Sequence, residues 1–498
     1  LDMVENMEAT DTEDSSLNFG VVVDCGSSGS RISTLASTPD KANDYLQPLL
    51  SFAADHIPKK KHKETLLYIL CTAGMRLLPE SQQMAILEDL NTDIPLQFDF
   101  LFSSSHAEVI SGKQEGVYAW IGINFVLGRF DHAEEGEDTV VTVITDSQTQ
   151  HPVSRKRTVG VLDMGGASLQ IAYEVPITVG FTSPEQEEAA KSIIAEFNLG
   201  CDIQHTQHVY QVYVSTFLGF GGNMARQRYE DHLINSTAYR SRNECHIPIP
   251  RPCLPVRLTD TVQSDGQTVF LRGQGDWSRC QDVVRPFLGK TNGSTSSSLG
   301  GVYQAPIDFH NSEFYGFSEF YYCMEDVLRI GGYYSSTKYT RTATDYCATK
   351  WSTLKQRLDS KLFTSQTDLH RLKYQCFKSA WMYEVLHTGF QFPKDYPNLK
   401  TAQLVYDKEV QWTLGAILFK IRFLPLRDLQ VEAFRQSHSS WIRFSFVCNH
   451  YLIFACILVV VLAILLYILR LRRIHRREQR SAATLDLLLV EEGEPLKG

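Results

Sequence analysis

The chain has 498 residues, of which 43% are hydrophobic and 21% charged, a composition typical of a folded protein with more than one domain. Its net charge of -9 argues against general nucleic-acid binding, which requires a basic surface. The charge does not exclude a phosphate ligand, because a metal ion and backbone N–H groups bind phosphate without basic side chains.

Three apolar runs in the first third of the chain each end in a turn of small residues. Residues 18–23 lead into DCGSSGSR, residues 66–70 into CTAGMR, and residues 158–162 into DMGGASLQ. Each pattern predicts a strand followed by a tight turn. Helical patterns occur at residues 81–90 and 108–127, so strands and helices alternate. This alternation predicts an α/β fold.

Two of these turns repeat one design, in which an aspartate, two glycines and a hydroxyl follow a strand. The first copy runs from Asp24 to Arg31 and the second from Asp163 to Gln170. Glycines let the backbone approach a ligand, and consecutive N–H groups bind an anion. One copy alone is also explained by a plain hairpin turn. Two copies favour homologous half-domains that hold a phosphate chain between them, with each aspartate on a metal ion.

The C-terminal part carries the pattern of a membrane anchor. Residues 451–469 are uncharged and apolar over about the length of a bilayer-spanning helix, although a buried core helix is the alternative. The basic segment 470–480 is typical of the cytosolic side, which would place the preceding residues in a lumen or outside the cell. Because that large part must cross the membrane, we expect tail-first insertion or a signal that precedes this sequence.

Cysteine usage agrees with an oxidising lumen. The chain has 11 cysteines and no CxxC pair, so disulfides are favoured over a zinc ribbon. Two N-glycosylation triplets, at Asn235 and Asn292, agree with the same side of the membrane. The polar segments 134–150 and 259–298 predict a surface loop and an insertion.

Five segments, DCGSSGSR, CTAGMR, SGKQEGVYAW, DMGGASLQ and YGFSEFYYC, occur in this order. Together they resemble the apyrase conserved regions of the ecto-nucleoside triphosphate diphosphohydrolases, over about residues 19–412. Within that family the chain looks most like the intracellular branch, whose members lie in Golgi, lysosomal or other vesicle membranes with a lumenal catalytic domain. The plasma membrane is the alternative location. The sequence predicts no oligomeric state.

The resemblance implies a fold and an activity. The fold would be two actin-like, ribonuclease H-like domains that face a central cleft. The activity would be hydrolysis of the terminal phosphate of nucleoside tri- and diphosphates such as UDP, GDP, UTP, GTP and CTP, with Ca²⁺ or Mg²⁺ as cofactor.

The resemblance also implies roles for single residues. Glu115 would be the catalytic base that activates water, and Asp24 and Asp163 would hold the hydrated metal ion. The residues implied to bind the phosphates, the nucleotide or the attacking water are Ser27, Ser28, Gly29, Ser30, Arg31, Thr72, Gly165, Gly166, Ala167, Ser168, Gln170, Tyr315 and Phe317. The two aromatic residues are expected near the base, since aromatic faces stack on nucleobases. The implied disulfides are Cys253–Cys280 and Cys347–Cys376.

These observations predict five segments. They are a stub at residues 1–17, an N-terminal lobe at 18–160, a C-terminal lobe with an insertion at 161–440, a span at 451–469 and a cytosolic tail at 470–498.

The sequence departs from the family directly after the first loop. There the family continues into a second apolar strand that pairs with the first, whereas Arg31 is followed here by ISTLASTPDKANDYL. We therefore expect the N-terminal lobe to lack a strand pair. Two alternatives to a working hydrolase stay open: a form that only binds nucleotides or partners, and a sugar kinase or exopolyphosphatase on the same scaffold. The lumenal topology and the EGVYAW segment disfavour the kinase.

Overall fold

The computed structural model forms two compact units, residues 1–424 and residues 425–498. Ser27 to Arg31 and Asn292 lie outside the described residues. The structure describes residues 17–26, 38–130, 140–144, 152–175, 188, 193–198, 209–235, 248–264, 267–289, 297–364, 367–402, 404–405, 408–422, 458 and 461–473.

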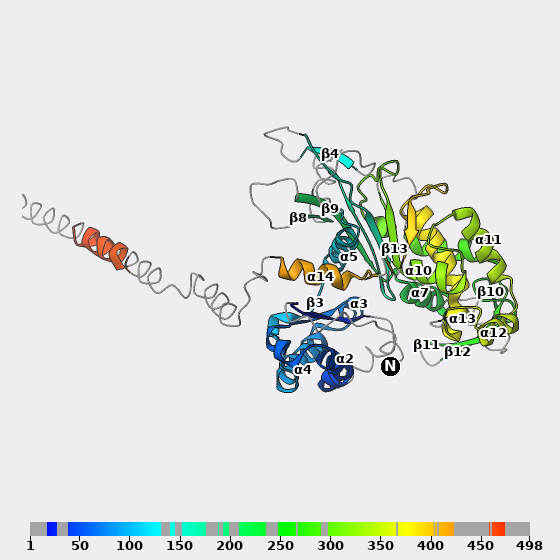
Figure 1. Cartoon of the computed structure of the whole chain (residues 1–498), viewed down its shortest axis with the longest axis horizontal. Coiled ribbons are helices and arrows are strands. Elements are labelled where there is room, and N and C mark those ends of the chain that lie inside the picture. The colour runs from blue at the N-terminus through cyan, green and yellow to red at the C-terminus, as the bar shows by residue number, and fades with distance from the viewer. Residues whose placement is uncertain are drawn as a thin grey trace, which may run out of the picture. The chain divides into compact units, whose positions relative to one another are not determined.

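A three-stranded parallel sheet carries Asp24, the first residue of the first predicted loop, near its carboxyl edge (Figure 1). Its strands lie in the order β1 (Gly20–Cys25), β2 (Leu66–Cys71) and β3 (Ala107–Val109). The central strand is buried along its whole length, as the sequence LLYILC predicts for a parallel strand covered on both faces. Among the described residues, β1 is an edge strand.

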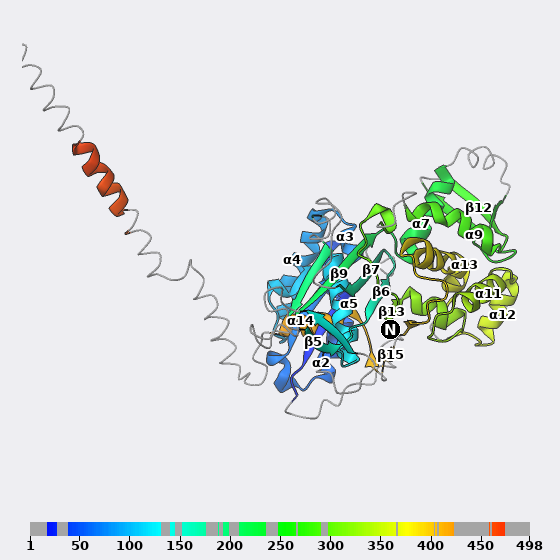
Figure 2. The same cartoon turned by 90° about the horizontal axis from the view of Figure 1, so that it is seen from above.

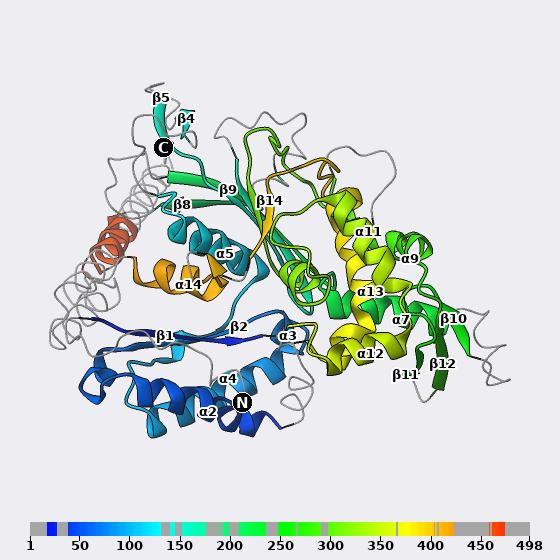
Figure 3. The ribbon, with the colours of Figure 1, turned by 45° about the vertical axis from the view of Figure 1, so that its right-hand side comes forward.

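Helices cover both faces of this sheet (Figure 3). On one face, α2 (Ala42–His56) and α4 (Glu80–Gln97) pack on each other and, through Leu50, Ile86, Leu90 and Ile94, share one hydrophobic core with the strands. On the other face, α14 (Trp412–Ile421) contacts β1. The short helix α3 (Ala73–Arg76) follows β2 directly.

A six-stranded mixed sheet forms the second half of this unit. The strands lie in the order β14-β13-β6-β7-β9-β8. Neighbours from β6 to β8 in that order pair antiparallel, whereas β13 pairs parallel with both β6 and β14. The bounds are β6 (Gly160–Met164), β7 (Ser168–Glu174), β8 (Ile194–Asn198), β9 (Val209–Leu218), β13 (Phe314–Ser318) and β14 (Leu399–Thr401).

The two sheets share one arrangement, in which a loop-bearing strand is followed by two parallel neighbours. β6-β13-β14 in the larger sheet corresponds to β1-β2-β3 in the smaller one. The loop after β6 leads straight into antiparallel β7, while β1 has no antiparallel partner in the part of the chain that the structure describes. The predicted α/β class is confirmed.

Two helices lie between the sheets. α5 (Gly112–Val126) contacts β6, β7 and β9, and α14 packs along α5 (Figure 3). Gly415 allows the two helices to approach closely. A Cβ at this position would lie 1.8 Å from the backbone oxygen of Tyr118, so only glycine fits there. The helix predicted over residues 108–127 begins at Gly112, later than expected. Glu108 belongs to β3, and Ser111 caps the helix.

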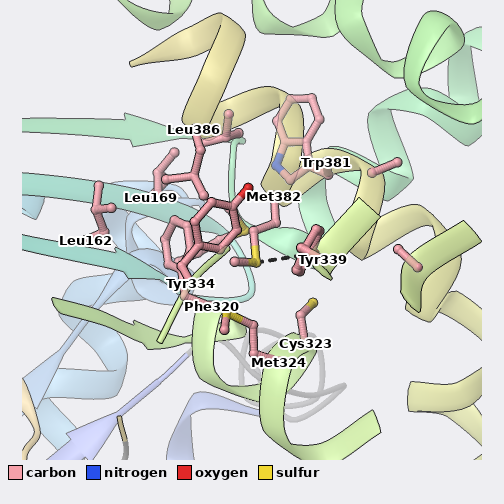
Figure 4. Packing of buried hydrophobic residues seen from close by; sticks show 14 of the residues in the cluster. Leu162, Leu169, Phe320, Cys323, Met324, Tyr334, Tyr339, Trp381, Met382 and Leu386 are labelled. Atoms are coloured by element: carbon pink, nitrogen blue, oxygen red, sulfur yellow. Dashed lines mark hydrogen bonds between the residues drawn. The ribbon is translucent and has the colours of Figure 1, made fainter. Parts of the chain in front are cut away.

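The other face of the six-stranded sheet packs against helices that follow β9 in the chain (Figures 1 and 2). Leu162 and Leu169 point from the sheet toward Phe320, Trp381 and Leu386 in one hydrophobic core (Figure 4). The helices on this side are α7 (Gly222–Asn235), α9 (Trp277–Val284), α10 (Glu319–Tyr321), α11 (Ser336–Cys347), α12 (Trp351–Asp359) and α13 (Leu369–Glu384).

Small sheets and hairpins complete the unit. The expected surface loop at residues 134–150 contains strand β4, which pairs with β5, so this prediction was wrong at residues 140–144. The expected insertion at 259–298 holds two strands and α9. The bounds are β4 (Val140–Ile144), β5 (Pro152–Lys156), β10 (Ile249–Arg251), β11 (Thr259–Ser264), β12 (Gln267–Gly273), β15 (Leu404–Val405) and β16 (Lys408–Glu409).

The second unit includes part of the predicted span. Of residues 451–469, the structure describes residue 458 and residues 461–469, all helical. Among the residues described here, no helix has both the length and the apolar character needed to cross a membrane.

Candidate active site

Glu115 lies in the first turn of α5, and the local sequence explains its position. Ser111 caps the helix: its side chain accepts from the Gln114 N–H, and the Gln114 side chain accepts from the Ser111 N–H. A Cβ on Gly116 would lie 2.7 Å from the side chain of Val214 on β9. The glycine therefore lets α5 press its Glu115 end against the six-stranded sheet.

Glu115 and three other side chains form one hydrogen-bonded cluster. Arg76 Nη2 donates to Glu115 Oε2 over 2.9 Å and lies 3.3 Å from Ser168 Oγ. Gln170 Nε2 donates to the same Glu115 oxygen over 3.0 Å and to Ser168 Oγ over 2.8 Å. Both bonds reach Oε2, so Oε1 accepts from no side chain in the described ranges. The residues come from α3, α5 and β7, which are separate in the sequence.

Burial changes the acidity of Glu115. The residue is 8% exposed, and loss of solvent raises the pKa of its carboxyl to about 7 from an ordinary value of 4.5. The nearby Arg76 charge opposes this rise, while Asp163 and Asp24 add to it. A carboxyl with a pKa near neutrality is suited to accept a proton in a catalytic step.

Two aspartates approach this cluster from the two sheets. Asp163 at the end of β6 is 7% exposed, and its Oδ1 has no hydrogen-bond partner among the described residues. Burial raises the pKa of Asp163, and a hydrogen bond from Ser318 opposes the rise. Asp24 at the end of β1 accepts from Trp412 Nε1 over 3.2 Å. Asp24 is an exposed residue, but the groups crowded around its carboxyl desolvate it and raise the pKa of Asp24 to about 7, and the charge of Asp163 adds to the effect.

This pair fits a divalent cation. Carboxylate oxygens are the ligands that Ca²⁺ and Mg²⁺ prefer, and a cation would relieve the repulsion that the two aspartates exert on each other. The unpartnered buried oxygen of Asp163 is available to a cation, which would offset the cost of burying it.

Within the second predicted loop, residues 165 and 166 are fixed by backbone hydrogen bonds with the start of α7. The carbonyl of Gly165 accepts from the Gly222 N–H over 2.9 Å, and the carbonyl of Gly166 accepts from the next two N–H groups of the helix over 3.0 Å each. The N–H of Gly165 donates within the turn, to the Ser168 carbonyl over 3.0 Å. The N–H groups of Gly166 and Ala167 donate to no acceptor in the described ranges, so these two remain for an anion.

The remaining predicted residues occupy supporting positions. Thr72 precedes α3, is 4% exposed, and donates its N–H to the carbonyl of Cys25 at the end of β1 over 3.4 Å. Phe317 pairs in register with Asp163 on the neighbouring strand. The rings of Tyr315 and Phe317 stack 6.4 Å apart and are 8% and 7% exposed, so neither presents an open face to a nucleobase.

Two residues of the site, Arg76 and Trp412, were not predicted from the sequence. Arg76 is the cation of the CTAGMR segment, and that position in the motif was the available signal. Trp412 reaches Asp24 from α14, far along the chain, and no local pattern marks it.

The implied disulfides are both present. Cys253 and Cys280 are joined with their Cα atoms 4.9 Å apart, and Cys347 and Cys376 with theirs 5.3 Å apart. Asn235 ends α7, at the start of its glycosylation triplet.

Known proteins resemble this chain in sequence. An ectonucleoside triphosphate diphosphohydrolase 7 of Xenopus tropicalis is 60% identical over 537 aligned positions, which cover 99% of this chain and 88% of that protein. An ectonucleoside triphosphate diphosphohydrolase 4 of Homo sapiens is 59% identical and is covered to 87%. Because the alignment is longer than the 498 residues of this chain, the relatives contain aligned residues with no counterpart here.

A solved structure and a family signature complete the comparison. The fold resembles a nucleoside triphosphate hydrolase structure from Neospora caninum with a TM-score of 0.53 at 14% identity, over 80% of this chain and 81% of the other. The signature of the GDA1/CD39 (nucleoside phosphatase) family matches residues 31–433. The chain belongs to the GDA1/CD39 (nucleoside phosphatase) family.

Proposed function

We propose that this protein hydrolyses the terminal phosphate of nucleoside tri- and diphosphates with water activated by Glu115. The observation that carries the proposal is the cluster of Glu115, Arg76, Ser168 and Gln170 beside the unpartnered oxygen of Asp163. Family membership and the names of the relatives support the substrate class. UDP, GDP, UTP, GTP and CTP are the proposed nucleotides.

Proton transfer to Glu115 starts the reaction. A water hydrogen-bonded to the open Oε1 gives its proton to the carboxylate as its oxygen attacks the terminal phosphorus. The bond from phosphorus to the bridging oxygen breaks, and the shortened nucleotide leaves with that oxygen. Arg76 and Gln170 fix the orientation of Glu115 through its other oxygen, so the base is positioned before the substrate binds.

Ser168 and the second loop would hold the water and the phosphate. Ser168 Oγ accepts from Gln170 and lies 3.3 Å from Arg76, so its own proton can point toward the attacking water. The N–H groups of Gly166 and Ala167 would donate to a phosphate oxygen. Ser27 to Arg31 would do the same from the first lobe.

Asp24 and Asp163 would hold hydrated Ca²⁺ or Mg²⁺. A bound divalent cation neutralises phosphate charge and stabilises the charge that develops in phosphoryl transfer. With the cation present, we expect both aspartates to be ionised.

A second candidate function has its own support. β1 lacks an antiparallel partner among the described residues, and the aligned relatives contain residues that this chain lacks. Both observations support a missing strand pair after Arg31. Such a chain would bind nucleotides and hydrolyse them slowly, or only bind them.

We also propose a lumenal catalytic unit anchored by residues 451–469. The uncharged run and its basic flank support the anchor, and large apolar side chains from Leu458 to Leu471 are exposed, as a lipid-facing helix requires. The two disulfides support an oxidising compartment. The proposed compartment is a Golgi, lysosomal or other vesicle membrane. Protease protection of sealed vesicles tests the topology: the catalytic unit should be protected and the tail cleaved.

One pair of variants tests the catalytic proposal. Glu115→Gln removes the base and should reduce phosphate release about 10²–10⁴-fold with nucleotide binding retained. The matched control is Glu230→Gln, because Glu230 forms a similar buried ion pair with Arg226, at 12% and 18% exposure against 11% and 16% for Glu115 and Arg76. The control should keep wild-type turnover. Equal activity of the two variants would contradict the role of Glu115, and binding without release by the wild-type chain would favour the second candidate.

A further inference from the structure

Two cysteine thiols meet at the carboxyl ends of β1 and β2. Cys25 and Cys71 are the last residues of the parallel strands β1 and β2, and they are register partners. Their side chains are hydrogen-bonded to each other. Neither belongs to a disulfide in the structure, and the proposed hydrolysis uses neither thiol.

The strand geometry places the Cα atoms of this pair within the range of separations that a disulfide joins. Neighbouring strands lie about 4.8 Å apart, and disulfides join Cα atoms roughly 4.4–6.8 Å apart. Register partners on adjacent strands point to the same face of a sheet, and both cysteines pack against the core beneath α2 and α4. Asp24, one residue earlier, points the other way, toward Trp412. A bond between the sulfurs would therefore form behind the site without occupying it.

One further thiol is free among the described residues, that of Cys323, and its surroundings differ from those of the pair. Cys323 is fully buried on the core face of the other lobe, where its sulfur contacts Glu319. It has no thiol beside it in the described ranges. Cys25 is half-buried, while Cys71 is 1% exposed, so a small reagent meets Cys25 first. The hydrogen bond with Cys71 and burial raise the pKa of the Cys25 thiol, so its reaction is slow at neutral pH.

We propose that Cys25 and Cys71 are a modification site, at which a reversible disulfide fastens the loop-bearing strand β1 to β2. The same chain already forms two disulfides, so an oxidising compartment is consistent with its structure. β1 is an edge strand among the described residues and carries Asp24. A covalent link at its end is the attachment that an absent strand partner would otherwise supply.

The reaction is a thiol–disulfide exchange with a small-molecule disulfide such as glutathione disulfide. The sulfur of Cys25 loses its proton and attacks the reagent, which forms a mixed disulfide and releases one glutathione thiol. The sulfur of Cys71 then attacks the Cys25 sulfur, its proton is lost, and the second glutathione thiol leaves. Two cysteine thiols lose two electrons in total, and one glutathione disulfide gains them as two thiols.

The test uses the whole folded protein in glutathione buffers of graded ratio. Remaining thiols are then trapped with a maleimide while the protein is denatured, so that buried thiols react as well, and the protein is mapped by mass spectrometry without reduction. We expect a cross-linked Cys25–Cys71 peptide to appear as the buffer becomes more oxidising, while Cys323 stays alkylated. Maleimide on both Cys25 and Cys71 in the most oxidising buffer would overturn the proposal, and so would glutathione retained on Cys25 without the cross-link.

Thermal unfolding is the second measurement, and it tests whether the Cys25–Cys71 disulfide stabilises the fold. Closing a loop of this length should raise the thermal midpoint by roughly 5 °C or more in the oxidised buffer. The rise should vanish in Cys25→Ser, the milder variant because this residue is half-buried, and persist in the control Cys323→Ala. A rise that persists in Cys25→Ser would show that other thiols cause it. Neither readout depends on nucleotide hydrolysis, so the outcome is independent of the proposed function.

Discussion

Replacing Arg76 by methionine should shift the pH dependence of phosphate release. Arg76 donates to Glu115 over 2.9 Å, with the two side chains 16% and 11% exposed, so the ion pair is largely shielded from water. Burial already raises the pKa of Glu115 to about 7, and the Arg76 charge is the main factor that holds it down. Methionine keeps the length of the side chain and removes the charge.

The magnitude follows from the effect of a neighbouring cation. An adjacent arginine lowers a carboxyl pKa by about 1–3, so its loss should raise the pKa of Glu115 by at least about 1. A general base works deprotonated, and its activity therefore rises with pH through its pKa. At pH 7 the active fraction should fall from about one half to about one tenth, so kcat/KM drops about fivefold from protonation alone. The deficit should shrink as the pH rises toward 9.

The assay is phosphate release over pH 5.5–9.5 at saturating Mg²⁺. Arg76→Lys keeps the positive charge and should leave the acid limb of the profile closer to wild type, and Arg226→Met controls for loss of a similar ion pair elsewhere. If the acid limb of Arg76→Met coincides with that of the wild type while the rate falls uniformly, Arg76 does not act through Glu115.

Three further changes test other parts of the structure. Gln170→Leu removes a hydrogen bond to Glu115 and one to Ser168, so kcat should fall at least about tenfold with KM little changed; a large KM effect alone would contradict the positioning role. Cys347→Ser combined with Cys376→Ser opens a disulfide that links residues 29 apart, and should cost about 3–4 kcal/mol in the free energy of unfolding, measured with denaturant. Gly415→Ala would place a Cβ 1.8 Å from a backbone oxygen of α5, so we expect a loss of at least about 2 kcal/mol; an unchanged midpoint would show that α14 can move aside.

Local patterns predicted the elements that carry the site. Apolar runs that end in small residues do become β1, β2 and β6. β2 and β6 are buried along their whole length, and such a strand needs continuous apolar residues. The order of the motifs also singled out Glu115 and Asp163 as site residues, and the fold brings them close enough for the charge of Asp163 to act on Glu115. The helix start was missed by a few residues because the Ser111 capping box, rather than the apolar period, sets it.

Contacts between elements far apart in the chain could not be predicted from local sequence patterns. Arg76 reaches Glu115 only because α3 follows the central strand of one sheet while α5 lies on the other. Trp412 meets Asp24 through contact of α14 with β1. Strand β4 was missed because a polar, acidic stretch flanks it, and a hairpin partner outside that stretch decides its structure.

Transfer of labelled oxygen from water tests the central claim most directly. The wild-type chain is incubated with UTP and, separately, with UDP in ¹⁸O-water with Mg²⁺ or Ca²⁺. The ¹⁸O content of the phosphate and nucleotide products is then measured by mass spectrometry. Attack of water on the terminal phosphorus predicts one ¹⁸O atom in each released phosphate and none in the nucleotide product. Label in the nucleotide, or no phosphate released above a Glu115→Gln control, would contradict it.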